Sequence, residues 1–140
     1  MTVSGTSHQV AVIPYRRVGD HVTVCLIRRK HTESWGIPKG FIDPGDTPEE
    51  AALTEALEEA GLLGELTGTA IGSYDYTKRG VPFTVAVYLM RVLEDREEWQ
   101  EMRFRDRAWC SMTESAERLV NHPVWPLWDR AKERLEGPSR

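Results

Sequence analysis

GFIDPGDTPEEAALTEALEEAGL, residues 40–62, decides the fold of this chain, because it contains the clearest helix and the signals that begin and end it. Thr47-Pro48-Glu49-Glu50 combines an N-cap, a proline at the first helical position and a glutamate three residues after the cap. Gly61 is a typical C-terminal stop. The stretch therefore predicts a helix over about Pro48–Ala60, ~20 Å long at 1.5 Å per residue.

Three carboxylates share one face of this predicted helix. Glu55, Glu58 and Glu59 lie three and four positions apart, and at 3.6 residues per turn they fall within roughly 100° of arc. Carboxylates that close repel one another unless a cation lies between them, and Mg²⁺ is a hard ion that prefers oxygen ligands. A glutamate-rich face is more often simply solvated, so the surrounding residues must decide between the two interpretations.

Composition limits the classes of protein that the chain can represent. Its 140 residues predict one domain over residues 1–140, with a net charge of −4 that argues against general nucleic-acid binding. No apolar stretch approaches the ~20 residues that a membrane span needs, and no signal peptide opens the chain, so we expect a cytoplasmic protein that does not bind membranes. Cys25 and Cys110 lie in apolar runs and are expected to be buried thiols.

Strands are predicted on both sides of the helix. Runs rich in β-branched residues, separated by turn residues, predict strands at 8–15, 21–28, 68–76, 82–93 and 107–112. Residues 34–41 are expected to form a loop or short strand, and 94–103 an acidic loop. Two helices should follow, one capped by Thr113 and running to about Val120, and a last one opened by Pro123.

The last predicted helix has an apolar stripe that should face the core, formed by Val124, Leu127, Trp128, Ala131 and Leu135. Strands that flank one long crossover helix and end in two further helices predict an α/β (α+β) fold, in which a mixed β-sheet lies between helices.

Taken as a unit, Gly40 to Leu62 resembles the Nudix box. The pattern of that family is Gly, five residues, Glu, seven residues, then Arg-Glu-U-x-Glu-Glu-x-Gly-U, where U is aliphatic. The residues in register are Gly40, Glu55, Glu58, Glu59, Gly61 and Leu62. The resemblance implies a single Nudix hydrolase domain over 1–140, with the box at 40–62 and an α/β/α sandwich fold.

Two positions depart from the family pattern. Asp46 stands where the family has Glu, and Thr54 stands where it has Arg. In the family that arginine pairs with an acidic partner and holds the catalytic helix in place. Thr54 cannot carry charge, so the support of Glu55 is in question, and a catalytically weak module that senses nucleotides is one alternative.

Residues outside the box resemble particular branches of the family. Trp35, Lys78-Arg79 and Arg107-Ala108-Trp109 are similar to residues of the diphosphoinositol polyphosphate phosphohydrolase-like branch. Trp35 to Gly40 also resembles the diadenosine polyphosphate hydrolases. These similarities imply hydrolysis of a phosphoanhydride in a substrate of one of those two classes. The alternatives are an oxidised nucleoside triphosphate, ADP-ribose or capped RNA.

The resemblance also implies roles for single residues. Glu55 and Glu59 would be ligands of Mg²⁺ or Mn²⁺, with Glu55 counted as catalytic too. Glu58 would accept a proton and also ligate the metal, and the backbone carbonyl of Lys39 would be a further ligand. A further acid is drawn in some members from a loop after the helix; the candidates are Glu98 and Glu101.

Basic clusters in an acidic chain suit a compact polyanion such as a small-molecule polyphosphate. The candidate substrate contacts are Arg28, Arg29, Lys30, Lys39, Gly40, Lys78 and Arg79. Alternation along a strand should place Arg28 and Lys30 on one face and Arg29 on the other. Both a monomer and a homodimer are compatible with the sequence.

Overall fold

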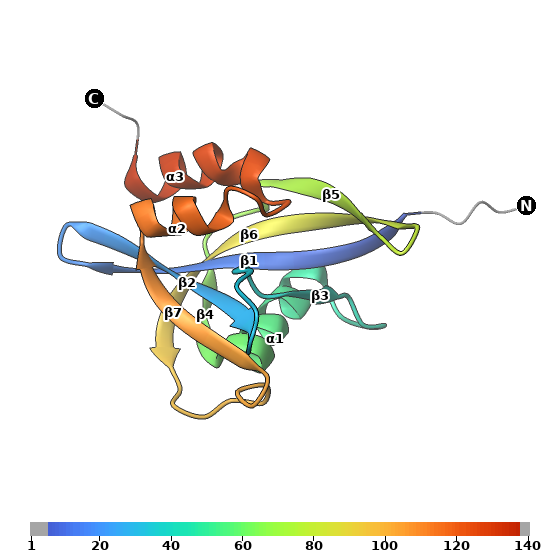
Figure 1. Ribbon diagram of the computed structural model, residues 1–140, viewed down its shortest axis with the longest axis horizontal. Helices are drawn as coiled ribbons and strands as arrows, with labels where there is room; N and C mark the ends of the chain where they lie inside the picture. Colours follow the sequence, from blue (N-terminus) through green and yellow to red (C-terminus); the bar gives the residue numbers. More distant parts are fainter. Residues whose placement is uncertain (1–5, 138–140) are drawn as a thin grey trace, which may run out of the picture.

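The computed structural model describes residues 6–137, which form a mixed β-sheet with helices on both sides (Figure 1). Residues 1–5 and 138–140 lie outside the described part. The elements in chain order are β1 (Ser7–Val18), β2 (His21–Arg29), β3 (Lys39–Phe41), α1 (Pro48–Ala60), β4 (Leu62–Leu66), β5 (Gly72–Lys78), β6 (Val81–Asp95), β7 (Arg105–Ser111), α2 (Met112–Leu119), the 3₁₀ turn η1 (Trp125–Leu127) and α3 (Trp128–Glu136).

Strand β1 lies at the centre of the sheet. The strand order is β4-β6-β1-β2-β7, with β3 paired to β1 and β5 paired to β6. β1 and β6 run parallel, and every other pairing in the described chain is antiparallel. The sheet is therefore mixed, as the sequence predicts.

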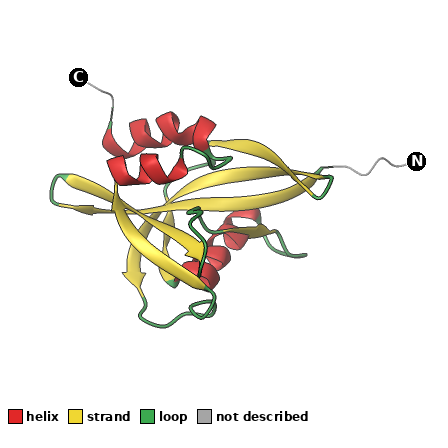
Figure 2. Ribbon diagram, in the orientation of Figure 1, coloured by secondary structure: helices red, strands yellow, loops and turns green. Residues whose placement is uncertain are grey.

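The two faces of β1 belong to two separate cores. Ala11 and Ile13 pack into the core beneath α2 and α3, whereas Val10 and Val12 pack into the core beneath α1. A strand buried on both faces explains the continuous apolar run of β1. Figure 2 shows the resulting sandwich, with α2 and α3 on one side of the sheet and α1 on the other, which confirms the predicted layering.

Helix α1 spans the predicted residues. The Thr47 side chain accepts a hydrogen bond from the Glu50 N–H at 3.0 Å, and the Glu50 carboxylate accepts one from the Thr47 N–H at 2.8 Å. This capping box satisfies two N–H groups at the start of the helix. Gly61 ends the helix with φ = 70°, a left-handed conformation that favours glycine.

Strand β4 was not predicted, and β5 begins later than expected. β4 is short and pairs with β6 through a register shift between Leu63 and Gly64. A Cβ atom at Gly64 would collide with the backbone carbonyl of Arg91, so glycine permits the close approach. The expected strand 68–76 was wrong at its start, because Gly68 has φ = 97° and β5 begins at Gly72.

The predicted boundaries of the last elements need correction. Ser111, not Thr113, caps α2. Its hydroxyl accepts a hydrogen bond from the Glu114 N–H at 3.0 Å, and the Glu114 carboxylate accepts one from the Ser111 N–H at 2.9 Å. The last α-helix begins at Trp128, after a 3₁₀ turn, rather than at Pro123.

The last two strands also differ from the prediction in their bounds. β6 extends to Asp95, into the expected acidic loop, because its end pairs with β4. β7 begins at Arg105, two residues before the predicted start, and ends at Ser111.

The buried side chains agree with the sequence predictions. The five residues of the predicted apolar stripe are all buried, namely Val124, Leu127, Trp128, Ala131 and Leu135. Cys25 and Cys110 are buried free thiols. No helix in residues 6–137 is long and apolar enough to cross a membrane.

Candidate active site

Strand β3 and helix α1 meet where Gly40 faces Glu55. Gly40 pairs with Val10 of β1, whose side chain packs into the core beneath α1. A Cβ atom at Gly40 would lie 2.5 Å from each carboxylate oxygen of Glu55. Glycine at this position therefore leaves the space that the Glu55 carboxylate occupies.

Glu59 is a buried carboxylate with two polar partners. Its side chain belongs to a residue that is 7% exposed. The backbone N–H of Lys39 donates a hydrogen bond to Oε1 at 3.1 Å, and Arg105 Nη2 lies 3.5 Å from Oε2. A buried carboxylate is tolerated only when it is paired and hydrogen-bonded, and these contacts meet that condition from β3 and β7.

Glu55 and Glu59 form a close acid pair. Burial, followed by the hydrogen bond and the charge of Glu59, raises the pKa of Glu55 from 4.5 to about 8. Burial also raises the pKa of Glu59, although Arg105 and the Lys39 N–H oppose that effect. A pair of carboxyl groups this close holds a proton in place of a second negative charge.

The acid pair fits a divalent hard cation. Within residues 6–137, no three or more His, Cys, Asp or Glu side chains are gathered as a complete set of metal ligands. Mg²⁺ commonly takes only one or two carboxylates and fills its other positions with water and substrate phosphates. Two adjacent carboxyl groups, of which burial and then the neighbouring Glu59 raise the pKa of Glu55, are oxygen donors of that kind.

The remaining candidate acids lie in different surroundings. Glu58 lines a hollow of about 270 Å³, which it shares with Thr54, Glu98 and Trp99. The charge of Glu101 acts on both Glu55 and Glu59. Arg105 contacts both Glu59 and Glu101, so the structure brings Glu101 near the acid pair, whereas Glu98 lines the hollow with Glu58.

The predicted basic residues do not form one group. Arg28 and Lys30 each contact the Asp106 carboxylate at 3.2 Å, on one face of the sheet. Arg29 pairs with Arg105 across β2 and β7, so it shares the face of the acid pair. The predicted division of these three residues between two faces is confirmed.

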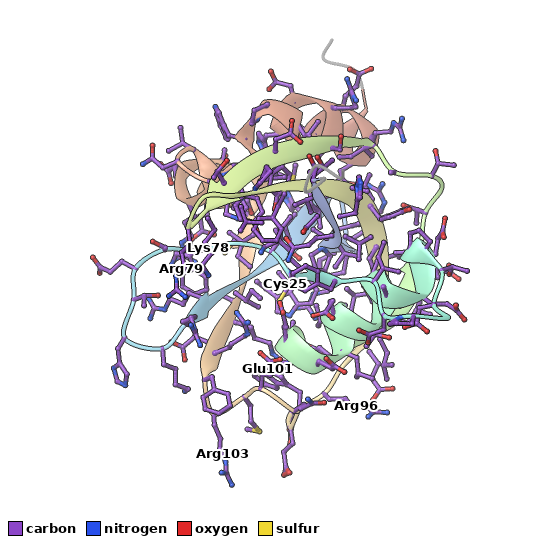
Figure 3. All side chains as sticks on the ribbon, turned by 90° about the vertical axis from the view of Figure 1, so that its right-hand side faces the viewer. Cys25, Lys78, Arg79, Arg96, Glu101 and Arg103 are labelled. Atoms are coloured by element: carbon purple, nitrogen blue, oxygen red, sulfur yellow. The ribbon has the colours of Figure 1, made fainter. Side chains whose placement is uncertain are left out.

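Lys78 and Arg79 lie at the tip of the β5–β6 hairpin, where Arg79 adopts φ = 52°. Figure 3 shows both side chains well away from Glu101, which lies beside α1.

A cluster of aromatic side chains lies on the opposite face of β3 from the acid pair. This aromatic cluster consists of Phe41, Tyr76 and Phe83. The Tyr76 and Phe83 rings are stacked with centroids 4.9 Å apart, and the Phe41 ring lies 6.0 Å from Phe83. Phe41 is 55% exposed. Because β3 alternates, Gly40 faces α1 while Phe41 faces the other side.

Lys39 connects the two faces. Its backbone N–H bonds Glu59, and its ammonium group donates to the Tyr76 hydroxyl at 2.9 Å. The Tyr76 hydroxyl in turn donates to Gln9 Oε1 at 2.7 Å. Sequence reasoning missed this chain of contacts, because its members come from three strands that are far apart in the sequence. The one local signal is Gln9, a polar residue at the start of an apolar strand.

Comparisons with known proteins identify the family of the chain. The family model described as NUDIX domain matches residues 6–128. Nudix hydrolase 17, mitochondrial, of Arabidopsis thaliana is 32% identical over 143 residues, which covers 96% of this chain and 78% of that protein. Diphosphoinositol polyphosphate phosphohydrolase 2 of Rattus norvegicus is 26% identical over 134 residues, covering 94% of this chain and 72% of that protein. The chain spans 62% and 61% of the length of two other plant relatives.

A solved structure shares the fold. The crystal structure of the C. elegans Ap4A hydrolase matches with a TM-score of 0.77 and 19% identity, covering 94% of this chain and 99% of that one. At this level of identity, the match shows a common architecture of sheet and helices.

Proposed function

The chain belongs to the Nudix family and is a Nudix pyrophosphohydrolase, and from this premise we propose that it hydrolyses a phosphoanhydride bond in a dinucleoside polyphosphate. The observation that carries the choice of substrate is the aromatic cluster on the opposite face of β3 from the acid pair. Nucleobases stack on aromatic side chains, whereas an inositol ring has no π-face to stack. Lys39 contacts both groups, so one elongated substrate could reach the two faces of β3.

Glu55 and Glu59 are the proposed ligands of Mg²⁺ or Mn²⁺, together with the backbone carbonyl of Lys39. When bound, the metal ion would neutralise charge on the phosphate oxygens and acidify water at the site. Glu58 is the proposed proton acceptor. As the oxygen of water bonds to phosphorus and the bridging P–O bond breaks, the proton of that water passes to the Glu58 carboxylate.

Arg29 is the proposed phosphate contact on the face of the acid pair. It lies directly across the strand pair from Arg105. Arg105 is already paired with Glu59 and Glu101, whereas Arg29 makes no ion pair among the described residues, so its guanidinium group is available to bind a phosphate. Arg28 and Lys30 already contact Asp106, so they are weaker candidates.

A diphosphoinositol polyphosphate is the second candidate substrate. The supporting observation is the similarity to the rat diphosphoinositol polyphosphate phosphohydrolase 2 over 94% of this chain. Such a substrate carries many phosphate groups and needs several cations that converge on one place. The separation of the predicted basic residues between two faces and a distant hairpin argues for the dinucleoside class. The cytoplasmic location and the oligomeric state remain predictions.

The decisive experiment measures kcat/KM with Mg²⁺ over a panel of diadenosine polyphosphates, a diphosphoinositol polyphosphate, ADP-ribose, an oxidised nucleoside triphosphate and capped RNA. We expect the highest value for a diadenosine polyphosphate and its loss in Glu59→Gln. Equal turnover by the wild type and Glu59→Gln would contradict the proposed site.

The role of the aromatic cluster is tested separately with Phe41→Ala. Stacking of a base contributes about 1–3 kcal/mol, so kcat/KM for the diadenosine substrate should fall by about 5-fold to 150-fold. Leu93→Ala is the control, because Leu93 is also exposed, at 62%, and lies at the far end of β6. An equal loss for the inositol substrate would count against base stacking.

A further inference from the structure

The C-terminal end of α1 is held by residues that follow β6. The last turn of the helix contains no basic residue of its own. Its backbone carbonyls instead receive hydrogen bonds from residues 96–107. The Glu101 N–H donates to Glu58 O at 3.0 Å, the Trp99 indole N–H to Glu59 O at 3.0 Å, and Arg107 Nη1 to Ala60 O at 2.7 Å. Carbonyls at helix ends need such outside partners.

Close packing accompanies these hydrogen bonds. The Arg107 guanidinium lies 4.1 Å from the centre of the Trp99 ring. A Cβ atom at Gly61 would lie 2.8 Å from both Arg107 Nη1 and Trp99 Cβ. The segment therefore fits against the end of the helix with no room for a side chain at Gly61, and it fixes where the glutamates of α1 stand.

Arg105 extends this contact to the carboxylates themselves. Its Nε donates to Glu101 Oε1 at 2.8 Å, and its Nη2 lies 3.5 Å from Glu59 Oε2. Arg105 is the only cationic side chain in residues 6–137 that is within ion-pairing distance of Glu59. One guanidinium thus joins an acid of α1 to an acid of the β6–β7 loop, with two nitrogens in a fixed fork.

We propose that Arg105 is a positioning residue of the active site, which sets the orientation of Glu59 and brings Glu101 to the acid pair from outside the helix. This inference rests on the proposed function in one respect, namely that Glu55 and Glu59 hold the metal ion. Arg105 supplies from β7 the cationic support for the acid pair that Thr54, on the helix, cannot give.

The test uses Arg105→Ala, Arg105→Lys and the wild type, with Mn²⁺ titrated calorimetrically into each protein without substrate. Loss of a partner that orients a metal ligand typically costs about 10–100-fold in metal affinity or activity, so Arg105→Ala should bind Mn²⁺ correspondingly more weakly. At saturating substrate, the kcat of Arg105→Ala should fall below that of the wild type by a similar factor. The Mn²⁺ affinity and kcat of Arg105→Lys should lie between those of the wild type and Arg105→Ala, because one ammonium group cannot contact both Glu59 and Glu101.

Arg103→Ala is the matched control. Arg103 is two residues away, is exposed, and points away from α1 in Figure 3. We expect its Mn²⁺ affinity and kcat to equal those of the wild type.

Unchanged or tighter Mn²⁺ binding in Arg105→Ala would indicate a different role for this residue. If Arg105 acted only as a charge that competes with the metal ion, its removal would tighten Mn²⁺ binding. Unchanged or tighter binding in folded Arg105→Ala would overturn the proposal. If that variant does not fold, Arg105→Lys decides alone, with weaker binding supporting the proposal and wild-type binding overturning it. A wild type that binds Mn²⁺ but cleaves no dinucleoside polyphosphate would contradict only the proposed substrate.

Discussion

Replacing Gly40 with alanine should reduce the activity strongly while changing the free energy of unfolding little. The added methyl group would lie 2.5 Å from each Glu55 carboxylate oxygen, whereas ordinary contacts begin at 3.4 Å. The Glu55 carboxylate is the free end of a flexible side chain, so it can move aside at little cost in folding free energy. That movement must be about 1 Å, and a displacement of this size in an active site can reduce the rate about a hundredfold.

The assay compares Gly40→Ala, Glu55→Gln and the double variant by kcat/KM and by thermal unfolding. We expect Gly40→Ala to lose about a hundredfold in kcat/KM while its free energy of unfolding changes by less than about 1 kcal/mol. If the methyl group acts through Glu55, the double variant should be no worse than Glu55→Gln, since residues in contact are not additive. Additive losses, or full activity in Gly40→Ala, would refute this reasoning.

Three further predictions concern pH and the helix end. Burial, with a smaller effect from the charge of Lys39, lowers the pKa of His122 from 6.5 to about 4. This lowered pKa means that the stability contributed by neutral His122 is present above pH 6.5 and is lost as the pH falls through about 4. The loss amounts to about 3 kcal/mol, and urea unfolding of His122→Asn should show a weaker acid dependence. For Glu55 the sign is reversed, because a pKa raised to about 8 gives stability that is complete below pH 4.5 and lost as the pH rises through 8. Metal-free protein should therefore lose stability over this range, Glu55→Gln should lose less because only Glu59 then titrates in the pair, and added Mg²⁺ should restore stability at pH 8. Trp99→Phe should keep an aromatic ring but lose the hydrogen bond to Glu59 O and part of the packing of the larger indole, lowering the free energy of unfolding by at least about 1 kcal/mol in denaturant titrations; an unchanged midpoint would show that the indole N–H contributes nothing.

Much of the fold was predictable because its signals are local. The capping box at Thr47 and the left-handed Gly61 act within one turn of chain, so the bounds of α1 follow from the sequence. The prediction of the α2 cap was wrong, because Ser111, with Glu114 in a capping box, begins this helix in place of Thr113. Strand β4 was missed because its short sequence becomes a strand only by pairing with β6.

Part of the candidate site was also predictable from local signals, and part was not. The spacing of Glu55, Glu58 and Glu59 predicts a shared helix face, and the structure places Glu55 and Glu59 together. The partners of those acids come from distant strands, as Arg105 does, and no local pattern indicates them. The separation of Arg28 from Arg29 followed from alternation, but the contact of Arg28 with Asp106 required the pairing of β2 with β7.

The sequence by itself determined the bounds of α1 and the shared face of its three glutamates, because capping and helical periodicity operate over a few neighbouring residues. Its resemblance to the Nudix box predicted the family, which the family model confirms. Only the tertiary structure decided how those glutamates are supported. Pairing of β1 with β3 turns Gly40 toward Glu55 and Phe41 toward the opposite face, and the packing of residues 96–107 brings Arg105 to Glu59. These contacts depend on closing long stretches of chain, which the free energy of the whole core makes possible and no short motif encodes.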